Sequence, residues 1–167
     1  MIFVTVGTHE QSFERLIKKI DELKADGKIE DEVIIQKGFT SYEPKNCTSY
    51  QLIGYEEMQK YIADARIVIT HGGPASFIAP LVLGKIPIVV PRKKEFEEHV
   101  NNHQVDFLKQ LVARDNNVIP VYDIDDLEEK IIEYENIVKN MMKNYESNSK
   151  KFNENLEKEL KSLFREK

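Results

Sequence analysis

A histidine and two glycines stand between an apolar run and a proline near the middle of the sequence. Residues 67–69 are apolar and β-branched, His71, Gly72 and Gly73 follow after one threonine, and Pro74 stands where a first helical turn accepts a residue without an N–H. This pattern predicts a strand, a turn and a helix start. Backbone amides and the positive end of the helix dipole would point into such a turn, and glycines would let a ligand approach the backbone closely. We therefore expect a phosphate or diphosphate to bind here.

Two side chains of this turn could take part in binding. Ser76 adds a hydroxyl in the first helical turn, and His71 could donate a hydrogen bond to an anion or orient a sugar. The alternative is that the turn is only a tight connection and that His71 is bonded within its own loop. Local chemistry leaves both interpretations open.

Strands and helices alternate along the whole chain. The first apolar segment, residues 2–6, is followed by Gly7 and Thr8 and then by apolar residues at helical spacing. Further strands are expected at residues 33–36, 50–53 and 118–121 and just before Pro91. Further helices are expected after Gly54, from within the run 92–104 through Leu111, and from Leu127 to Met141. This alternation predicts an α/β, Rossmann-like fold with an open, mostly parallel sheet and helices on both faces. Such sheets bind ligands at the carboxyl ends of their strands, so the turns at Gly7, Gly38 and His71 would share one edge.

Composition limits the classes of protein that this chain can represent. Its 167 residues are 41% hydrophobic, which suits one domain, and the formal charge of −5 with scattered basic residues argues against a nucleic-acid partner. The single cysteine and the strand-like start indicate the cytoplasm. Spanning a bilayer takes about 20 apolar residues in a row, and the apolar runs here are much shorter.

We expect a domain over residues 1–142 and a C-terminal helical extension over residues 143–167. The extension is charged and carries one narrow apolar stripe, which suits packing on the domain or on another chain; its members are Phe152, Leu156, Leu160 and Leu163.

The run from Arg92 to Gln104 is dense in polar groups. We expect a surface loop and a helix start there, with the charges on a solvated face and with His103 and Gln104 as the exceptions. His99 and His103 stand four residues apart, as metal-binding histidines often do. No further ligand stands in a recognisable frame and the HExxH signature is absent, so we expect no metal.

Three segments together resemble a known family. VTVGTHEQSFERL at the start, THGGPAS in the middle and VPRKKEFEEHVNNHQ after it are similar to the nucleotide-sugar-binding half of GT-B glycosyltransferases. The similarity extends from Met1 to about Leu111. Relatives include the lipid II-forming transferase, the catalytic subunit of the dolichol-linked N-acetylglucosamine transferase and, above all, small subunits of two-component bacterial exopolysaccharide or capsule transferases.

The resemblance implies roles for individual positions. Residues that match the donor-binding positions of the family are Gly7 and Thr8 for the first phosphate-side turn, Gly54 and Tyr55 for uracil, His71, Gly72, Gly73 and Ser76 for the diphosphate, and His103 and Gln104 for the donor sugar. Ala79 departs from the family, because many two-domain relatives carry a carboxylate there that holds the ribose. Ribose recognition should therefore differ or be weaker in this chain.

The resemblance also implies a reaction. A base would draw the proton from an acceptor hydroxyl while UDP leaves the anomeric carbon, and the glycine-loop amides and helix dipole would stabilise the leaving diphosphate without a metal or another cofactor. His9 and Glu10 are the candidate bases, although they could instead open or cap the following helix.

The implied function is transfer of a hexose from a UDP-sugar to a lipid-linked oligosaccharide in exopolysaccharide or capsule biosynthesis. A membrane-anchored partner subunit would bind the acceptor and recruit this chain to the inner face of the membrane. The alternatives are a non-catalytic UDP-sugar-binding or scaffold subunit of a transferase complex, and a nucleotide-sugar epimerase.

Overall fold

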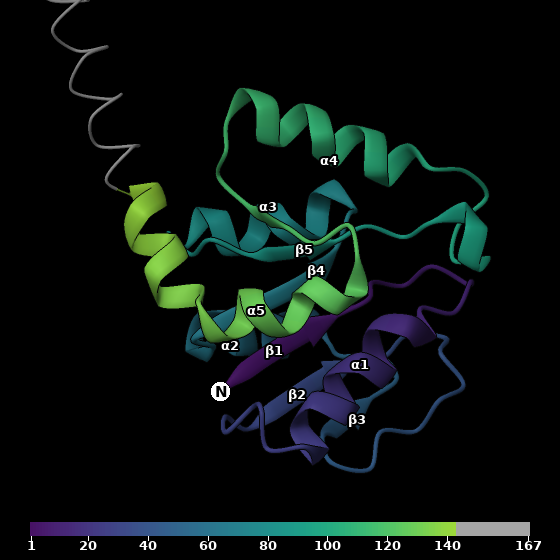
Figure 1. The fold of residues 1–167 in the computed structure, drawn as a ribbon. Helices are drawn as coiled ribbons and strands as arrows, with labels where there is room; N and C mark the ends of the chain where they lie inside the picture. The colour runs from purple at the N-terminus through teal and green to yellow at the C-terminus, as the bar shows by residue number, and fades with distance from the viewer. Residues whose placement is uncertain (143–167) are drawn as a thin grey trace, which may run out of the picture. The chain divides into compact units, whose positions relative to one another are not determined.

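The computed structural model describes residues 1–142, of which Met1–Tyr134 form one compact unit. Its strands and helices alternate along the chain (Figure 1). The strands are β1 (Ile2–Thr5), β2 (Val33–Gln36), β3 (Thr48–Tyr50), β4 (Ile67–His71), β5 (Ile88–Val90) and β6 (Ile119–Pro120). The helices are α1 (Glu14–Ala25), α2 (Tyr55–Asp64), α3 (Pro74–Val82), α4 (His103–Arg114) and α5 (Leu127–Ile132), with short 3₁₀ turns η1 (Lys94–Phe96) and η2 (Ile124–Asp126).

The six strands form one parallel sheet in the order β3-β2-β1-β4-β5-β6. β1 therefore lies in the middle, paired with β2 on one side and with β4 on the other. The strand order reverses between β1 and β4, which is the place where a doubly wound sheet opens a crevice at its carboxyl edge. The predicted Rossmann-like parallel sheet is confirmed.

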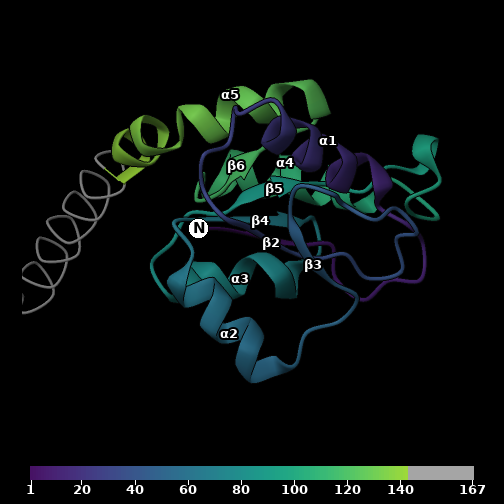
Figure 2. The same cartoon turned by 90° about the horizontal axis from the view of Figure 1, so that it is seen from below.

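Helices cover both faces of the sheet, as the sequence predicts. α2 and α3 lie on one face, and α1 and α5 lie on the other (Figure 2). Under α2, the buried core contains Phe3, Ile62 and Val68. Under α3, it contains Phe77 and Val89, which pack with Leu108 of α4. Strands covered on both faces are mostly apolar, which explains the short runs of apolar residues in β1 and β4.

α1 shows how local pattern produces this packing. Its apolar residues recur at helical spacing and are buried against the sheet: Leu16, Ile17, Ile20 and Leu23. On the solvent side Glu14 and Lys18 form an i,i+4 ion pair of 2.6 Å. The helix gives way at Gly27, whose φ of 69° suits glycine.

Two predicted boundaries are wrong. β3 covers Thr48–Tyr50 instead of residues 50–53, because the chain leaves the ladder after Tyr50 and the Ile53 amide donates to Gln36 Oε1 at 3.1 Å. The predicted last helix is interrupted at Glu133, between α5 and the helical residues 134–142. The predicted extension over residues 143–167, with its apolar stripe, lies outside the described residues.

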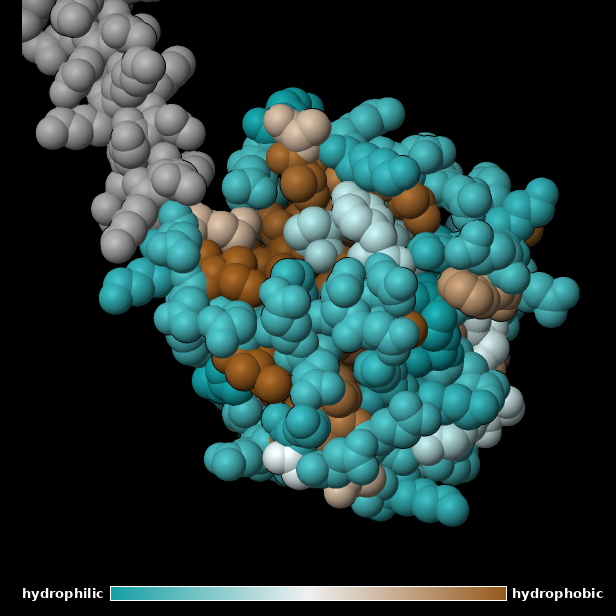
Figure 3. Space-filling model, in the orientation of Figure 1, coloured by the Kyte–Doolittle hydropathy of each residue, from teal (hydrophilic) through white to brown (hydrophobic). Residues whose placement is uncertain are grey.

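The surface seen from the side of Figure 1 is mostly hydrophilic, with hydrophobic residues gathered in separate patches (Figure 3). Among residues 1–142, no helix is long and apolar enough to cross a membrane.

Candidate functional site

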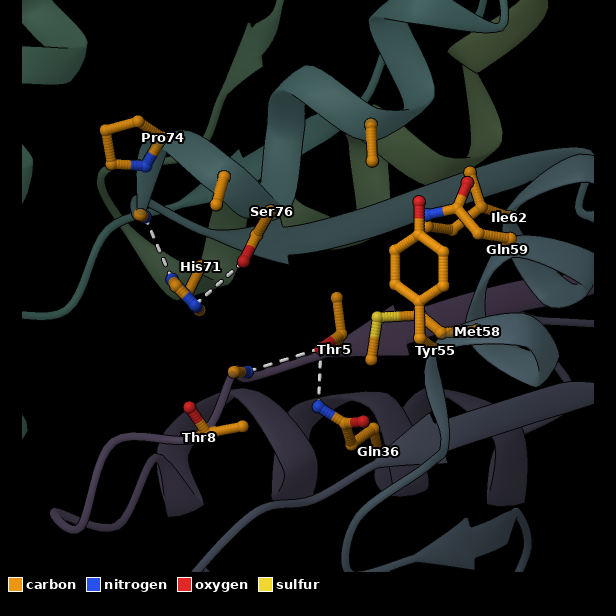
Figure 4. Close-up of a pocket in the computed structure, with 14 residues that line it drawn as sticks. Thr5, Thr8, Gln36, Tyr55, Met58, Gln59, Ile62, His71, Pro74 and Ser76 are labelled. Carbon is orange, nitrogen blue, oxygen red and sulfur yellow. Dashed lines mark hydrogen bonds between the residues drawn. The ribbon is translucent and has the colours of Figure 1, made fainter.

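A pocket of about 400 Å³ opens where the strand order reverses. The loop after β1 forms one wall, α2 forms another, and the loop after β4 with the start of α3 forms the third (Figure 4). Six predicted donor-binding residues line it: Gly7, Thr8, Tyr55, His71, Gly73 and Ser76. The other lining residues are Thr5, Gln36, Met58, Gln59, Ile62, Pro74, Ala75 and Ala79.

His71 is hydrogen-bonded within its own loop. Its Nδ1 accepts from the Gly73 N–H at 2.9 Å, and its Nε2 lies 3.0 Å from Ser76 Oγ. Burial, with a smaller contribution from the charge of Arg92, lowers the pKa of His71 to about 3, so the imidazole is neutral. Because Nδ1 is an acceptor, the single ring proton must be on Nε2, which donates to Ser76.

These hydrogen bonds determine which backbone N–H groups of the loop remain available to a ligand. The Gly73 N–H is used by His71, and the Gly72 N–H donates to Gln104 Oε1 at 3.0 Å. Within residues 1–142, the N–H of Ala75 donates to no protein acceptor, and Ala75 lines the pocket. The start of α3 therefore offers an anion the helix dipole and the Ala75 amide.

Two of the glycines leave space for the His71 ring. A Cβ added to Gly7 or to Gly73 would overlap the imidazole, and Gly7 also has a φ of 75°. The Gly72 position is tight for another reason, because a Cβ there would lie 2.9 Å from Gln104 Cβ. The sequence predicts that the glycines let a ligand approach the backbone. In the structure, Gly7 and Gly73 leave the space that the His71 ring occupies.

The wall opposite His71 combines fixed polar groups with an open aromatic ring. Thr5 Oγ1 accepts from Gly7 N and from Gln36 Nε2, both at 3.2 Å, which ties β1 to β2 below the pocket. Tyr55 begins α2, directly after Gly54, and is 77% exposed. Its ring, together with Met58 of the same helix, gives this wall an apolar surface at the mouth of the pocket (Figure 4).

The predicted bases and sugar-binding pair do not line the pocket. His9 and Glu10 are exposed on the loop after β1, where His9 packs against His99 with ring centroids 5.1 Å apart. Partial burial, then the charges of Arg92 and His99, lower the pKa of His9. His103 is exposed at the start of α4.

Gln104, Gly54 and Gly72 also lie beside the pocket without lining it. Gln104 Oε1 accepts from both Gly72 N and Arg92 N at 3.0 Å, so this oxygen joins two loops.

The prediction that the charged side chains after β5 lie on a solvated face is wrong for two residues. Arg92 is 1% exposed and Glu98 is 2% exposed. Glu98 accepts from Arg15 through both carboxylate oxygens at 2.9 Å, and the Arg92 side chain donates to backbone carbonyls of other segments. The one local signal for the burial of Arg92 is its position, because it directly follows an apolar strand and Pro91, which are themselves buried.

No group of three metal-binding side chains occurs in the described part of the chain. The polar groups of the pocket are hydroxyls, amides and a neutral imidazole, which suit an uncharged or anionic ligand.

Comparison with known proteins agrees with this architecture. Residues 1–163 match the family described as the glycosyltransferase family 28 C-terminal domain. The human UDP-N-acetylglucosamine transferase subunit ALG13 (Homo sapiens) is 34% identical over 119 residues, which cover 66% of this chain and 10% of that protein. This chain thus matches about a tenth of the length of that relative.

A solved structure extends the comparison to the fold. The glycotransferase of kitacinnamycin superposes with a TM-score of 0.57 at 14% identity, over 84% of this chain and 37% of that one. The expected resemblance to a GT-B donor-binding domain is confirmed by the family match and by this fold. The chain belongs to the glycosyltransferase family 28 C-terminal domain family.

Proposed function

We propose that this chain is the donor-binding subunit of a two-component glycosyltransferase. It would bind a UDP-hexose for transfer to a lipid-linked oligosaccharide in exopolysaccharide or capsule biosynthesis. The observation that supports this most is the pocket at the point where the strand order reverses between β1 and β4. Six of its lining residues are ones that the family pattern predicts for donor binding. Its volume of about 400 Å³ suits a small-molecule ligand.

The chemistry of the walls supports an orientation for the donor. The diphosphate would lie at the start of α3, beside Thr8 and Ser76, where the Ala75 amide is open. The uracil would stack on the exposed Tyr55 ring, with the backbone of Gly54 beside it. The donor sugar would then extend toward His103 and Gln104. Because Gln104 Oε1 is occupied, its contact with the sugar would use the Nε2 amide.

A partner subunit would bind the acceptor and supply the membrane anchor. The name of the human relative, a transferase subunit, supports this view, as does the description of the family as a C-terminal domain. Residues 143–167 are our candidate for part of the surface that meets the partner.

The source of the catalytic base separates two versions of the proposal. In the first, His9 or Glu10 accepts the proton of the acceptor hydroxyl once the partner closes over the carboxyl edge. In the second, this chain only binds and positions the donor and the partner supplies the base. The exposed position of both residues outside the pocket favours the second version.

The test is co-expression with a membrane-anchored partner, followed by assay of hexose transfer from UDP-sugars to a lipid-linked acceptor. We expect transfer only with both chains present. Transfer that survives His9→Ala with Glu10→Ala selects the second version. Conversion of the UDP-sugar without any acceptor would indicate an epimerase, and full transfer by this chain alone would contradict the two-component proposal.

A further inference from the structure

The buried side chain of Arg92 holds both ends of the loop after β1. Its Nη2 donates to the Val6 carbonyl at 2.8 Å, just before the loop. Its Nη1 donates to the carbonyls of Gln11 at 2.7 Å and Ser12 at 3.2 Å, just after it. One guanidinium therefore fixes the span of residues 7–10, which includes the pocket residues Gly7 and Thr8.

The backbone of Arg92 reaches the second loop of the pocket. The Arg92 N–H and the Gly72 N–H both donate to Gln104 Oε1, each at 3.0 Å. The loop after β4, which carries His71, is thereby fixed to the start of the segment after β5. Arg92 is thus connected to both loops that face each other across the pocket.

Stability alone gives a poor explanation for a guanidinium at this place. Nη1 also donates to the Glu98 carbonyl at 3.1 Å, and the Phe13 ring lies 4.9 Å from Cζ, but the Arg92 Nε has no partner within residues 1–142. The Glu98 carboxylate accepts from Arg15 and from the Lys93 N–H instead. An apolar side chain of similar volume would avoid the cost of taking this charge out of water. What a guanidinium adds is a set of rigid donors that reaches several carbonyls at once.

We propose that Arg92 is a positioning residue, which holds the loop of residues 7–10 and the loop around His71 at the separation that the donor requires. The proposal rests on the proposed function of the pocket. The His71 ring fits against Gly7, so a movement of the first loop would reach His71 directly. Arg92 does not line the pocket itself, and acts through Gly7, Thr8 and His71.

Arg92→Lys is the sharpest variant. Lysine keeps the positive charge, but one ammonium cannot replace a planar fork that donates to carbonyls on both sides of the loop. The imidazole signals of His9 and His71 would be followed by NMR at a temperature where the variant is folded, and UDP affinity by calorimetry. Arg114→Lys is the matched control, because Arg114 is exposed at the end of α4 and pairs with Asp115.

We expect both imidazole signals to shift in Arg92→Lys and UDP to bind about tenfold or more weakly, since several hydrogen bonds to a charged group are lost. Arg114→Lys should match the wild type in both measurements. A folded Arg92→Lys protein with unshifted histidine signals and wild-type UDP affinity would overturn the proposal.

A second variant covers the case in which Arg92→Lys does not fold. Gln104→Leu removes the shared acceptor while leaving the guanidinium in place, so it should shift the His71 signal and leave the His9 signal unchanged; an unshifted His71 signal would count against the proposal. The NMR measurement needs no ligand. If wild-type protein fails to bind UDP, the proposed function fails, whereas the histidine signals still decide the role of Arg92.

Discussion

The loops that follow β4 and β5 lie at the same edge of the sheet and are held in different ways. In the loop after β4, the His71 side chain bonds to neutral groups of its own loop, Gly73 and Ser76. The one long-range bond described for this loop also uses neutral groups, because the Gly72 N–H donates to the Gln104 side chain. The segment after β5 is held by a charged group and by long-range bonds, because the Arg92 guanidinium donates to carbonyls 80 to 86 residues away. A local loop can be recognised from a few adjacent residues. A buried charge can be understood only from partners that the fold brings to it.

The two loops should also differ in what a substitution costs. Hydrogen bonds between neutral groups are worth about 0.5–1.5 kcal/mol each in net stability, whereas a buried charge left without its partner costs about 3–5 kcal/mol. The segment after β5 should therefore be the more sensitive of the two to loss of a single polar group, and the loop after β4 should be the more sensitive to added volume.

The largest effect is expected at Glu98. Glu98→Gln removes the buried charge that faces Arg15, and we expect the free energy of unfolding to fall by about 3 kcal/mol, because the Arg15 guanidinium, which is only 13% exposed, loses its charged partner. Glu95→Gln is the control, since Glu95 pairs with Lys93 at the surface. Urea unfolding measures both. A loss below about 1 kcal/mol for Glu98→Gln would erase the contrast between the two loops.

A smaller loss is expected from added volume beside His71. Gly73→Ala places a Cβ against the imidazole, and overpacking of this kind costs about 1–3 kcal/mol. Gly54→Ala has open space around its Cβ and should change stability by less than about 0.5 kcal/mol. If His71 is the cause, the Gly73→Ala loss should shrink in a His71→Ala background, and an additive double mutant would show that the clash lies elsewhere.

The smallest effect, taken near pH 5.5, is the part of the acid sensitivity that His71 contributes. Its pKa is about 3 in the folded protein and 6.5 in the ordinary state, so the unfolded chain binds a proton that the folded chain does not. Stability is then complete above pH 6.5 and is lost as the pH falls toward 3, by about 1.4 kcal/mol at pH 5.5. His71→Gln should lack this part of the acid sensitivity. Equal pH dependence of both proteins would mean that His71 titrates normally.

Much of the fold could be predicted because its signals are local. The apolar runs of β1 and β4 and the 3.6-residue period of α1 depend on a few neighbouring residues. The boundary of β3 could not be predicted, because it depends on the Gln36 side chain taking the Ile53 amide.

The candidate site divides in the same way. Gly7, Thr8, Tyr55, His71, Gly73 and Ser76 could be proposed from glycine turns and family pattern, and they line one pocket. The α2 wall with Met58 and Gln59 could not, because it depends on how α2 packs beside α3. The burial of Arg92 could not be predicted, since its charge predicts exposure and the carbonyls of Val6, Gln11 and Ser12 that accept from it are brought to it by the fold.

Calorimetric titration of UDP into the purified chain in excess EDTA tests the central claim most directly. We predict saturable one-to-one binding that EDTA leaves unchanged, and an affinity about tenfold weaker in Tyr55→Ala, because stacking of a base on an aromatic ring is worth about 1–3 kcal/mol. Phe39→Ala, which truncates an exposed aromatic side chain outside the pocket, should bind like the wild type. Absence of UDP binding, or binding that Tyr55→Ala leaves unchanged, would contradict the assignment of this pocket to the donor.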